Sequence, residues 1–151
     1  MSDTKSPDKY DVVLSVRDHF ARLGYEVSYS DDEQGITFEL SAKKARDTFI
    51  VEVIGESAHK SRDIVFALGK LVKRMSKRGF WYHYGLAMPR DYFKLLKDFE
   101  TVGFDALKIH LFLVGEFLAI KHLDDKQTLE LMQHLKAGQI INPDLIDIGY
   151  P

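Results

Sequence analysis

The sequence predicts an α/β domain in which a mixed central sheet is flanked by helices, with a further helix near the C-terminus. Two observations carry this prediction. The spacing of apolar residues changes several times between steps of three to four residues and strict alternation. The 151-residue chain is also 45% hydrophobic and 29% charged, which is typical of a protein that buries its own core. We therefore expect a single domain over residues 1–151, with a core at about 8–120 and an added helix and tail at about 121–151.

The first part of the chain is expected to form a helix and three strands. Ser6-Pro7-Asp8 has the chemistry of a helix start, and Gly24 that of a helix end. Alternating apolar residues then predict two strands separated by an acidic turn, followed by a more evenly apolar strand that belongs in the middle of a sheet. The three strands should form an antiparallel meander. The expected ranges are 8–23 for the helix and 25–30, 36–42 and 48–55 for the strands.

The second part is expected to alternate helices with strands. Ser61 and Gly79 mark the start and the end of a second helix. Its apolar stripe consists of Ile64, Leu68, Leu71 and Met75. The remaining elements are expected at 80–88 (strand), 89–99 (short helix), 107–114 (strand), 117–120 (short strand) and 124–136 (helix).

Positive charge is concentrated in the middle of the chain, although the net charge is only −2. Residues 42–78 carry ten basic and four acidic side chains, between two acidic flanks. At 100° per residue, five cations of the second helix lie away from its apolar stripe. This pattern predicts a nucleic-acid-binding surface that contacts phosphate, and an ordinary solvated helix face is the alternative. The five residues are Lys70, Lys73, Arg74, Lys77 and Arg78.

Several kinds of site are excluded by residue content or spacing. The chain has no cysteine, which excludes disulfides and thiolate zinc sites. No apolar run reaches the roughly 18 residues of a membrane span, so we expect a cytoplasmic protein with no membrane partner. The six histidines include no pair three or four residues apart, which leaves a helical metal site unsupported. The segment 55–59 lacks the second glycine of a nucleophile elbow.

One strand and the helix after it carry a family resemblance. Phe49-Ile50-Val51-Glu52-Val53-Ile54-Gly55-Glu56 resembles the third strand of the PD-(D/E)xK nuclease superfamily, usually written as an apolar run ending V-E-V-K-G-E, with Ile54 in place of the lysine. Ala67-Leu68-Gly69-Lys70-Leu71 is similar to the A-L-G-Q-L segment of many members. The order of helices and strands also agrees over roughly residues 8–116. The resemblance implies a restriction endonuclease-like αβββαβ core with an added C-terminal helix.

The resemblance also implies a divalent metal site. In the family, two acids on adjacent strands hold Mg²⁺ or Mn²⁺, and a lysine positions the attacking water. Glu39 and Glu52 are then the metal ligands, and Glu52 with a relocated Lys70 the catalytic residues. Ile50 and Ile54 flank Glu52 on its strand face, so a cation should lie beside this carboxylate. We expect the variant Ile54→Lys to fold, because a lysine beside Glu52 gains a partner and can extend its amine toward solvent.

Two functions remain open. The first is a nuclease-fold protein with a degenerate active site that binds DNA, a protein partner or a second copy without catalysis. The second is a Mg²⁺-dependent endonuclease or DNA-processing enzyme that uses Glu39, Glu52 and Lys70. The missing lysine at position 54 favours the first. The aromatic cluster at 80–84 is expected to pack in the core and at its edge rather than stack on bases.

Overall fold

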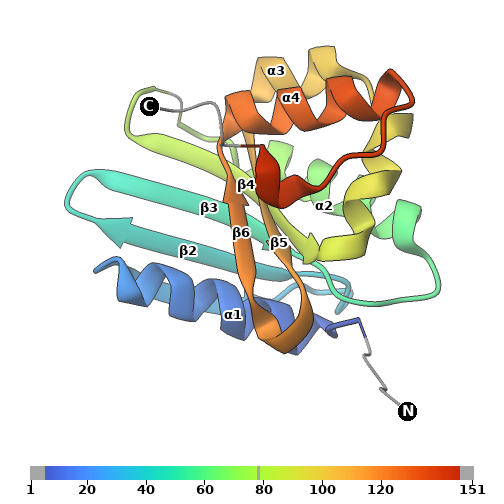
Figure 1. Ribbon diagram of the computed structural model, residues 1–151. Coiled ribbons are helices and arrows are strands. Elements are labelled where there is room, and N and C mark those ends of the chain that lie inside the picture. The colour runs from blue at the N-terminus through green and yellow to red at the C-terminus, as the bar shows by residue number, and fades with distance from the viewer. Residues whose placement is uncertain (1–5, 78, 147–151) are drawn as a thin grey trace.

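The structure is a computed structural model that describes residues 6–77 and 79–146 (Figure 1). Its helices are α1 (Lys9–Arg22), α2 (Lys60–Arg74), α3 (Thr101–Leu107) and α4 (Asp125–Lys136), with 3₁₀ segments η1 (Arg90–Asp98), η2 (Glu116–Leu118) and η3 (Pro143–Leu145). Its strands are β1 (Glu26–Asp31), β2 (Phe38–Lys44), β3 (Asp47–Val53), β4 (Tyr82–Pro89), β5 (Ile109–Val114) and β6 (Ile120–Leu123).

The strands form one mixed sheet in the order β1-β2-β3-β4-β5-β6. The pairs β1–β2 and β2–β3 are antiparallel, β3–β4 and β4–β5 are parallel, and β5–β6 is antiparallel. The predicted meander and the central position of β3 are therefore confirmed. Helix α2 connects β3 to β4, and η1 with α3 connects β4 to β5. An α/β protein with an open sheet flanked by helices is what the sequence predicted.

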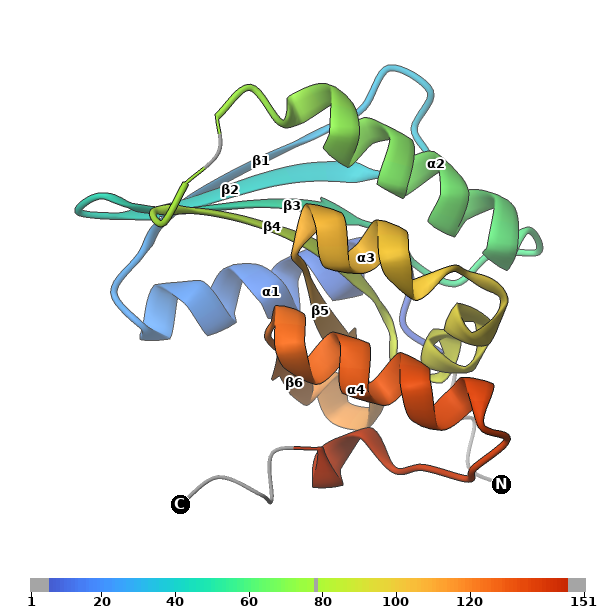
Figure 2. The same ribbon diagram turned by 90° about the horizontal axis from the view of Figure 1, so that it is seen from above.

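Helices cover both faces of the sheet. Figure 2 shows α1 and α2 on opposite sides of the strands β1 to β4. The face under α1 contains an apolar cluster with Val16, Phe20, Leu40 and Val51. The other face holds a larger cluster to which α2, α3, η1 and α4 all contribute. Leu131 and Met132 of α4 are fully buried in that cluster, so the C-terminal helix completes the core rather than being added outside it.

Strand β3 has one apolar face and one mixed face because side chains alternate along it. Phe49, Val51 and Val53 join the cluster under α1. Ile54, just beyond the strand, joins the cluster under α2 with none of its surface exposed. Glu52 lies on the same side as Ile54 and is also fully buried. A carboxylate at this position therefore needs partners inside the protein.

Helix α2 is turned about its axis relative to the prediction. Ile64, Ala67 and Leu71 are fully buried, whereas Leu68 is only partly buried. The predicted cap Ser61 is inside the helix, since His59 is the N-cap, and the helix ends at Arg74 rather than near Gly79. The sheet-facing side of α2 therefore includes Lys70 and Arg74 as well as apolar residues.

The chain differs from the prediction between β4 and β6. Helix α3 was not expected. The further strand predicted at 117–120 starts only at Ile120, because the residues before it form a turn closed by the Gly115 N–H, which donates to the Ala119 carbonyl at 2.8 Å. Phe117 and Leu118 have φ values of 56° and 58°, which a strand cannot contain. The strand β6 begins after them. No helix in the described part of the chain is long and apolar enough to cross a membrane.

Candidate active site

Glu52 is held by two hydrogen-bond donors from different elements. The Thr37 hydroxyl, just before β2, donates to Oε1 at 2.8 Å, and the Arg74 guanidinium of α2 donates to Oε2 at 2.5 Å. The prediction that a cation lies beside Glu52 is therefore confirmed, with Arg74 as the cation. Burial raises the pKa of Glu52 above its ordinary value, and the hydrogen bonds from Thr37 and Arg74 oppose part of this effect.

Arg74 also joins the C-terminal end of α2 to two strands. One guanidinium nitrogen donates to the Val51 carbonyl at 3.1 Å, and the other to the Leu40 carbonyl at 3.2 Å and to the Ser41 hydroxyl at 3.3 Å. The side chain is only 18% exposed. The structure thus places Arg74 inside the protein, where the sequence predicted a residue that contacts phosphate. Its charge is used to neutralise Glu52.

Glu39 and Lys70 form a second ion pair beside the first. Glu39 lies directly opposite Glu52 in the β2–β3 register, and its carboxylate is 2.5 Å from the Lys70 ammonium. The hydrogen bond to Glu39 raises the pKa of Lys70, and the charges of Glu52 and Asp32 act in the same direction. The three residues assigned to an active site by sequence are therefore brought together, with Lys70 paired to Glu39.

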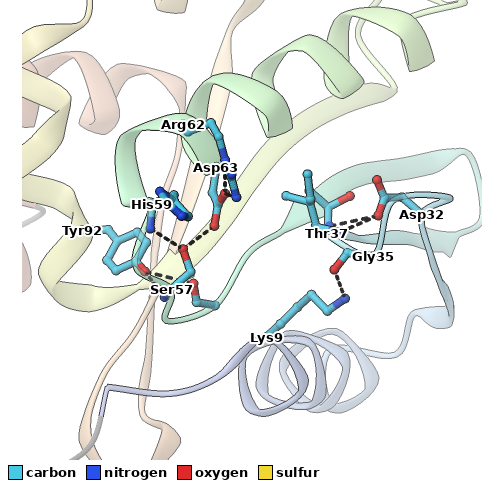
Figure 3. Close-up of polar contacts among 11 residues, drawn as sticks. Lys9, Asp32, Gly35, Thr37, Ser57, His59, Arg62, Asp63 and Tyr92 are labelled. Atoms are coloured by element: carbon cyan, nitrogen blue, oxygen red, sulfur yellow. Dashed lines mark hydrogen bonds and ion pairs between the residues drawn. The ribbon is translucent and has the colours of Figure 1, made fainter.

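Asp32 is a member of this cluster that the sequence did not reveal. It is 7% exposed and lies in the turn between β1 and β2. Its Oδ1 accepts from the backbone N–H groups of Ile36 and Thr37 at 2.7 and 3.2 Å, which Figure 3 shows for Thr37. Its Oδ2 is buried and has no hydrogen-bond partner in the described part of the chain. The turn thus connects Asp32 through Thr37 to Glu52. An acid in a tight turn is so common that its position in the sequence gave no signal.

The acids of this cluster are bonded to protein groups. Within residues 6–77 and 79–146, no group of three or more His, Asp or Glu side chains is placed to hold one. Mg²⁺ needs near-octahedral oxygen coordination and keeps several waters. Both oxygens of Glu52 accept hydrogen bonds from protein groups, and Glu39 is bound to Lys70. Lys70 and Arg74 therefore neutralise the two carboxylates that a metal ion would need as ligands.

The other three residues of the predicted basic stripe are Lys73, Lys77 and Arg78. Lys73 and Lys77 are exposed, unlike Lys70 and Arg74. The Lys77 ammonium lies 5.6 Å from the centre of the Tyr82 ring. Arg78 lies outside the described residues. The helix therefore presents fewer cations to a ligand than the sequence predicted.

The loop between β3 and α2 is fixed by a network of hydrogen bonds (Figure 3). The Ser57 hydroxyl donates to Asp63 at 2.6 Å and accepts from the His59 backbone N–H at 3.0 Å. The Tyr92 hydroxyl accepts from the Ser57 backbone N–H and donates to the Gly55 carbonyl. Ser57 is bonded to a carboxylate and not to a histidine side chain, which agrees with the absence of a nucleophile elbow in the sequence.

Four of the six histidines gather on the face under α1. Nδ1 of His110 lies 2.9 Å from Nε2 of His122, and the rings of His83 and His19 contact this pair. Burial lowers the pKa of His110 to about 4 and that of His122 to about 3. These two rings are therefore neutral near pH 7. The sequence missed the cluster because the sheet, and not a helical spacing, brings its members together.

The comparisons with known proteins identify no relative. No protein-family model matches the chain, and neither the curated proteins nor the solved structures contain a significant match. The candidate site therefore rests on its own geometry.

Proposed function

We propose that this chain is a non-catalytic nucleic-acid-binding protein built on a restriction endonuclease-like scaffold. The observation that carries the proposal is the pairing of Glu52 with Arg74 and of Glu39 with Lys70, both at 2.5 Å. The acids that a nuclease of this superfamily would use for metal binding are neutralised by side chains of α2. Such a cluster holds a helix to a sheet and needs no cofactor.

The order of the elements supports the scaffold. Helix α1 precedes an antiparallel meander, and β3 is followed by α2 and by the parallel strand β4. Glu39 and Glu52 face each other on neighbouring strands, as two acids of a shared site must. Ile54 is fully buried at the position of the family's lysine. Because Ile54 packs beneath α2, this position contributes to the apolar core and supplies no catalytic amine.

Exposed cations at one end of the molecule support nucleic acid as the ligand. The β2–β3 hairpin and the segment that leads from α2 into β4 lie at the same end of the sheet (Figures 1 and 2). We call this surface the basic end. Few of its cations are neutralised by acids, so phosphate is a matching ligand. Its exposed basic residues are Lys43, Lys44 and Arg46 of the hairpin, Lys73 near the end of α2, Lys77 just beyond that helix, and Lys108 before β5.

The double variant Lys73→Ser, Lys77→Ser tests this proposal. We expect its affinity for single-stranded and duplex DNA to fall, because each lysine that binds a phosphate releases counterions from the nucleic acid. The plot of log K against log salt should flatten by about 0.7 to 0.9 for each phosphate that the variant no longer binds. A salt titration followed by fluorescence anisotropy measures both quantities.

The matched control removes two lysines from another surface. Lys94 and Lys97 are exposed on η1, away from the basic end, and Lys94→Ser, Lys97→Ser should leave affinity and slope close to wild type. Equal effects of the two double variants would contradict a specific role for the basic end. Absence of DNA binding by the wild-type protein at low salt would overturn the proposed function.

One observation favours a Mg²⁺-dependent endonuclease as a second candidate. Glu39, Glu52 and Lys70 converge beneath α2, and the buried Oδ2 of Asp32 has no hydrogen-bond partner among the described residues. An enzyme of this kind would lose its cleavage activity in the variant Lys70→Ala. The non-catalytic protein has no such activity to lose.

A further inference from the structure

A hollow of about 1020 Å³ opens at the basic end, where β3, β4 and β5 begin. Segments distant in the sequence form its walls: the β2–β3 hairpin, the turn before β4 and the turn before β5. It lies at the hairpin end of the β2–β3 ladder, near Asp47 at the start of β3, whereas Glu52 lies toward the other end. It is therefore separate from the carboxylate cluster under α2.

Exposed aromatic rings form one wall of the hollow. Phe80 is 82% exposed and Trp81 is 44% exposed, and their rings meet edge to face at 5.1 Å. The cluster at 80–84 was predicted to pack in the core and at its edge; Tyr84 is in the core at 4% exposed, whereas Phe80 and Trp81 are exposed. Exposed rings at the mouth of a hollow offer a flat apolar surface on which a planar ligand can stack.

A fixed polar group lies in the hollow beside these rings. Asp47 accepts a hydrogen bond from the Tyr25 hydroxyl at 2.5 Å and lies 2.6 Å from Nε2 of His83. Burial and the bond to Asp47 raise the pKa of Tyr25 to about 12, so its hydroxyl stays a donor. When a neutral His83 ring donates its Nε2–H to Asp47, its Nδ1 is an acceptor. Phe49, stacked on the His83 ring at 4.6 Å, fixes the orientation of the imidazole.

Cations stand at the rim of the same hollow. Lys44 and Lys108 line it, and Lys77 lies over the ring of Tyr82, which also lines it. Of the acids that line it, Asp47 is already bonded to Tyr25 and His83, which leaves Asp125. A ligand that matches these walls has a planar ring, a hydrogen-bond donor on the edge of the ring and a negative charge outside it.

From these walls we propose that the hollow binds an unpaired nucleobase of a single-stranded nucleic acid. The base stacks on Trp81, an amino or imino group on its edge donates to Nδ1 of His83, and the flanking phosphates contact Lys44, Lys77 and Lys108. A base inside a duplex has no free face, so the hollow selects single strands. The inference rests on the proposed function and specifies the form of nucleic acid that the basic end binds.

Trp81 is the chain's one tryptophan, so its fluorescence reports directly on the hollow. A short single-stranded oligonucleotide is titrated into the wild-type protein at low salt, in parallel with the duplex of the same sequence and with the free mononucleotide. We expect saturable quenching by the single strand, little quenching by the duplex, and quenching by the mononucleotide only at much higher concentration, because it has fewer phosphates. Quenching by the mononucleotide at the same concentration as the strand would identify a free nucleotide as the ligand and overturn the proposal.

Two variants at position 81 separate stacking from folding. Trp81→Ala should weaken single-strand binding roughly 5- to 150-fold, the range that base–aromatic stacking gives, whereas Trp81→Phe keeps a ring and most of the affinity. Anisotropy of a labelled strand measures both, and Phe117→Ala removes a ring that is 95% exposed elsewhere on the protein as the control. The base site would be overturned if binding depends on salt, has the same affinity for strand and duplex, and does not quench Trp81. The proposed function would still hold in that case. No binding of either form would overturn both.

Discussion

Replacing Arg74 with alanine is expected to lower the free energy of unfolding by about 3–5 kcal/mol. The variant leaves the Glu52 carboxylate fully buried with Thr37 as its remaining hydrogen-bond donor, and it also removes the bonds from the guanidinium to the Leu40 and Val51 carbonyls. An uncompensated buried charge costs far more than the removal of an exposed ion pair. Urea unfolding followed by circular dichroism measures the change.

The neighbouring exposed cation is the matched control. Lys73→Ala should change the stability by less than about 0.5 kcal/mol, because its side chain points to solvent. The double variant Glu52→Met, Arg74→Met should be more stable than Arg74→Ala, since it removes both charges and keeps apolar volume. Equal stability of Arg74→Ala and Lys73→Ala would show that the Arg74–Glu52 pair does not hold α2 to the sheet.

The partner of Glu52 illustrates what the sequence could and could not predict. The flanking isoleucines showed that a buried acid at this position needs a cation, and the requirement follows from desolvation alone. Which cation meets it depends on the rotation of α2. Leu68 and Met75 suggested a face that differs from the one observed, in which Ala67, Lys70 and Arg74 also point to the sheet. Long basic side chains can point toward the sheet when they form ion pairs with acids on the strands. The positions of apolar residues alone do not reveal such cations.

The meander and the position of β3 could be predicted because alternation and turn residues are local signals. Asp32 and the histidine cluster could not. Asp32 meets Thr37 across a tight turn, and His110 meets His122 across the β5–β6 ladder, so both contacts depend on strand register. The start of the strand predicted at 117–120 was wrong for another reason, since the apolar residues Phe117 and Leu118 are exposed in a turn.

The variant Ile54→Lys is expected to lose about 4 kcal/mol of stability or more, contrary to what the strand pattern alone suggested. Ile54 is fully buried in the cluster under α2, and both oxygens of Glu52 already accept hydrogen bonds, from Thr37 and Arg74. The lysine must therefore leave water without gaining a carboxylate of its own. Burial would lower the pKa of its amine, so the loss relative to wild type should shrink as the pH rises toward the ordinary lysine pKa.

Chemical denaturation of this variant at several pH values tests the expectation. Val65→Lys is the control, because Val65 is 58% exposed on α2 and its replacement by lysine should be nearly neutral. A stable Ile54→Lys variant would mean that the cluster under α2 opens easily, and would restore the expectation that a lysine can stand beside Glu52.

We propose that Glu39 and Glu52 are partners of protein cations and do not hold a metal ion. The most direct test is a calorimetric titration of the wild-type protein with Mn²⁺ near neutral pH, combined with a cleavage assay on single-stranded and duplex DNA in the same buffer. We predict no saturable Mn²⁺ binding at this site and no cleavage, because Arg74 and Lys70 already neutralise both acids. Stoichiometric Mn²⁺ binding that is lost in Glu52→Gln, together with DNA cleavage that is lost in Lys70→Ala, would contradict the account.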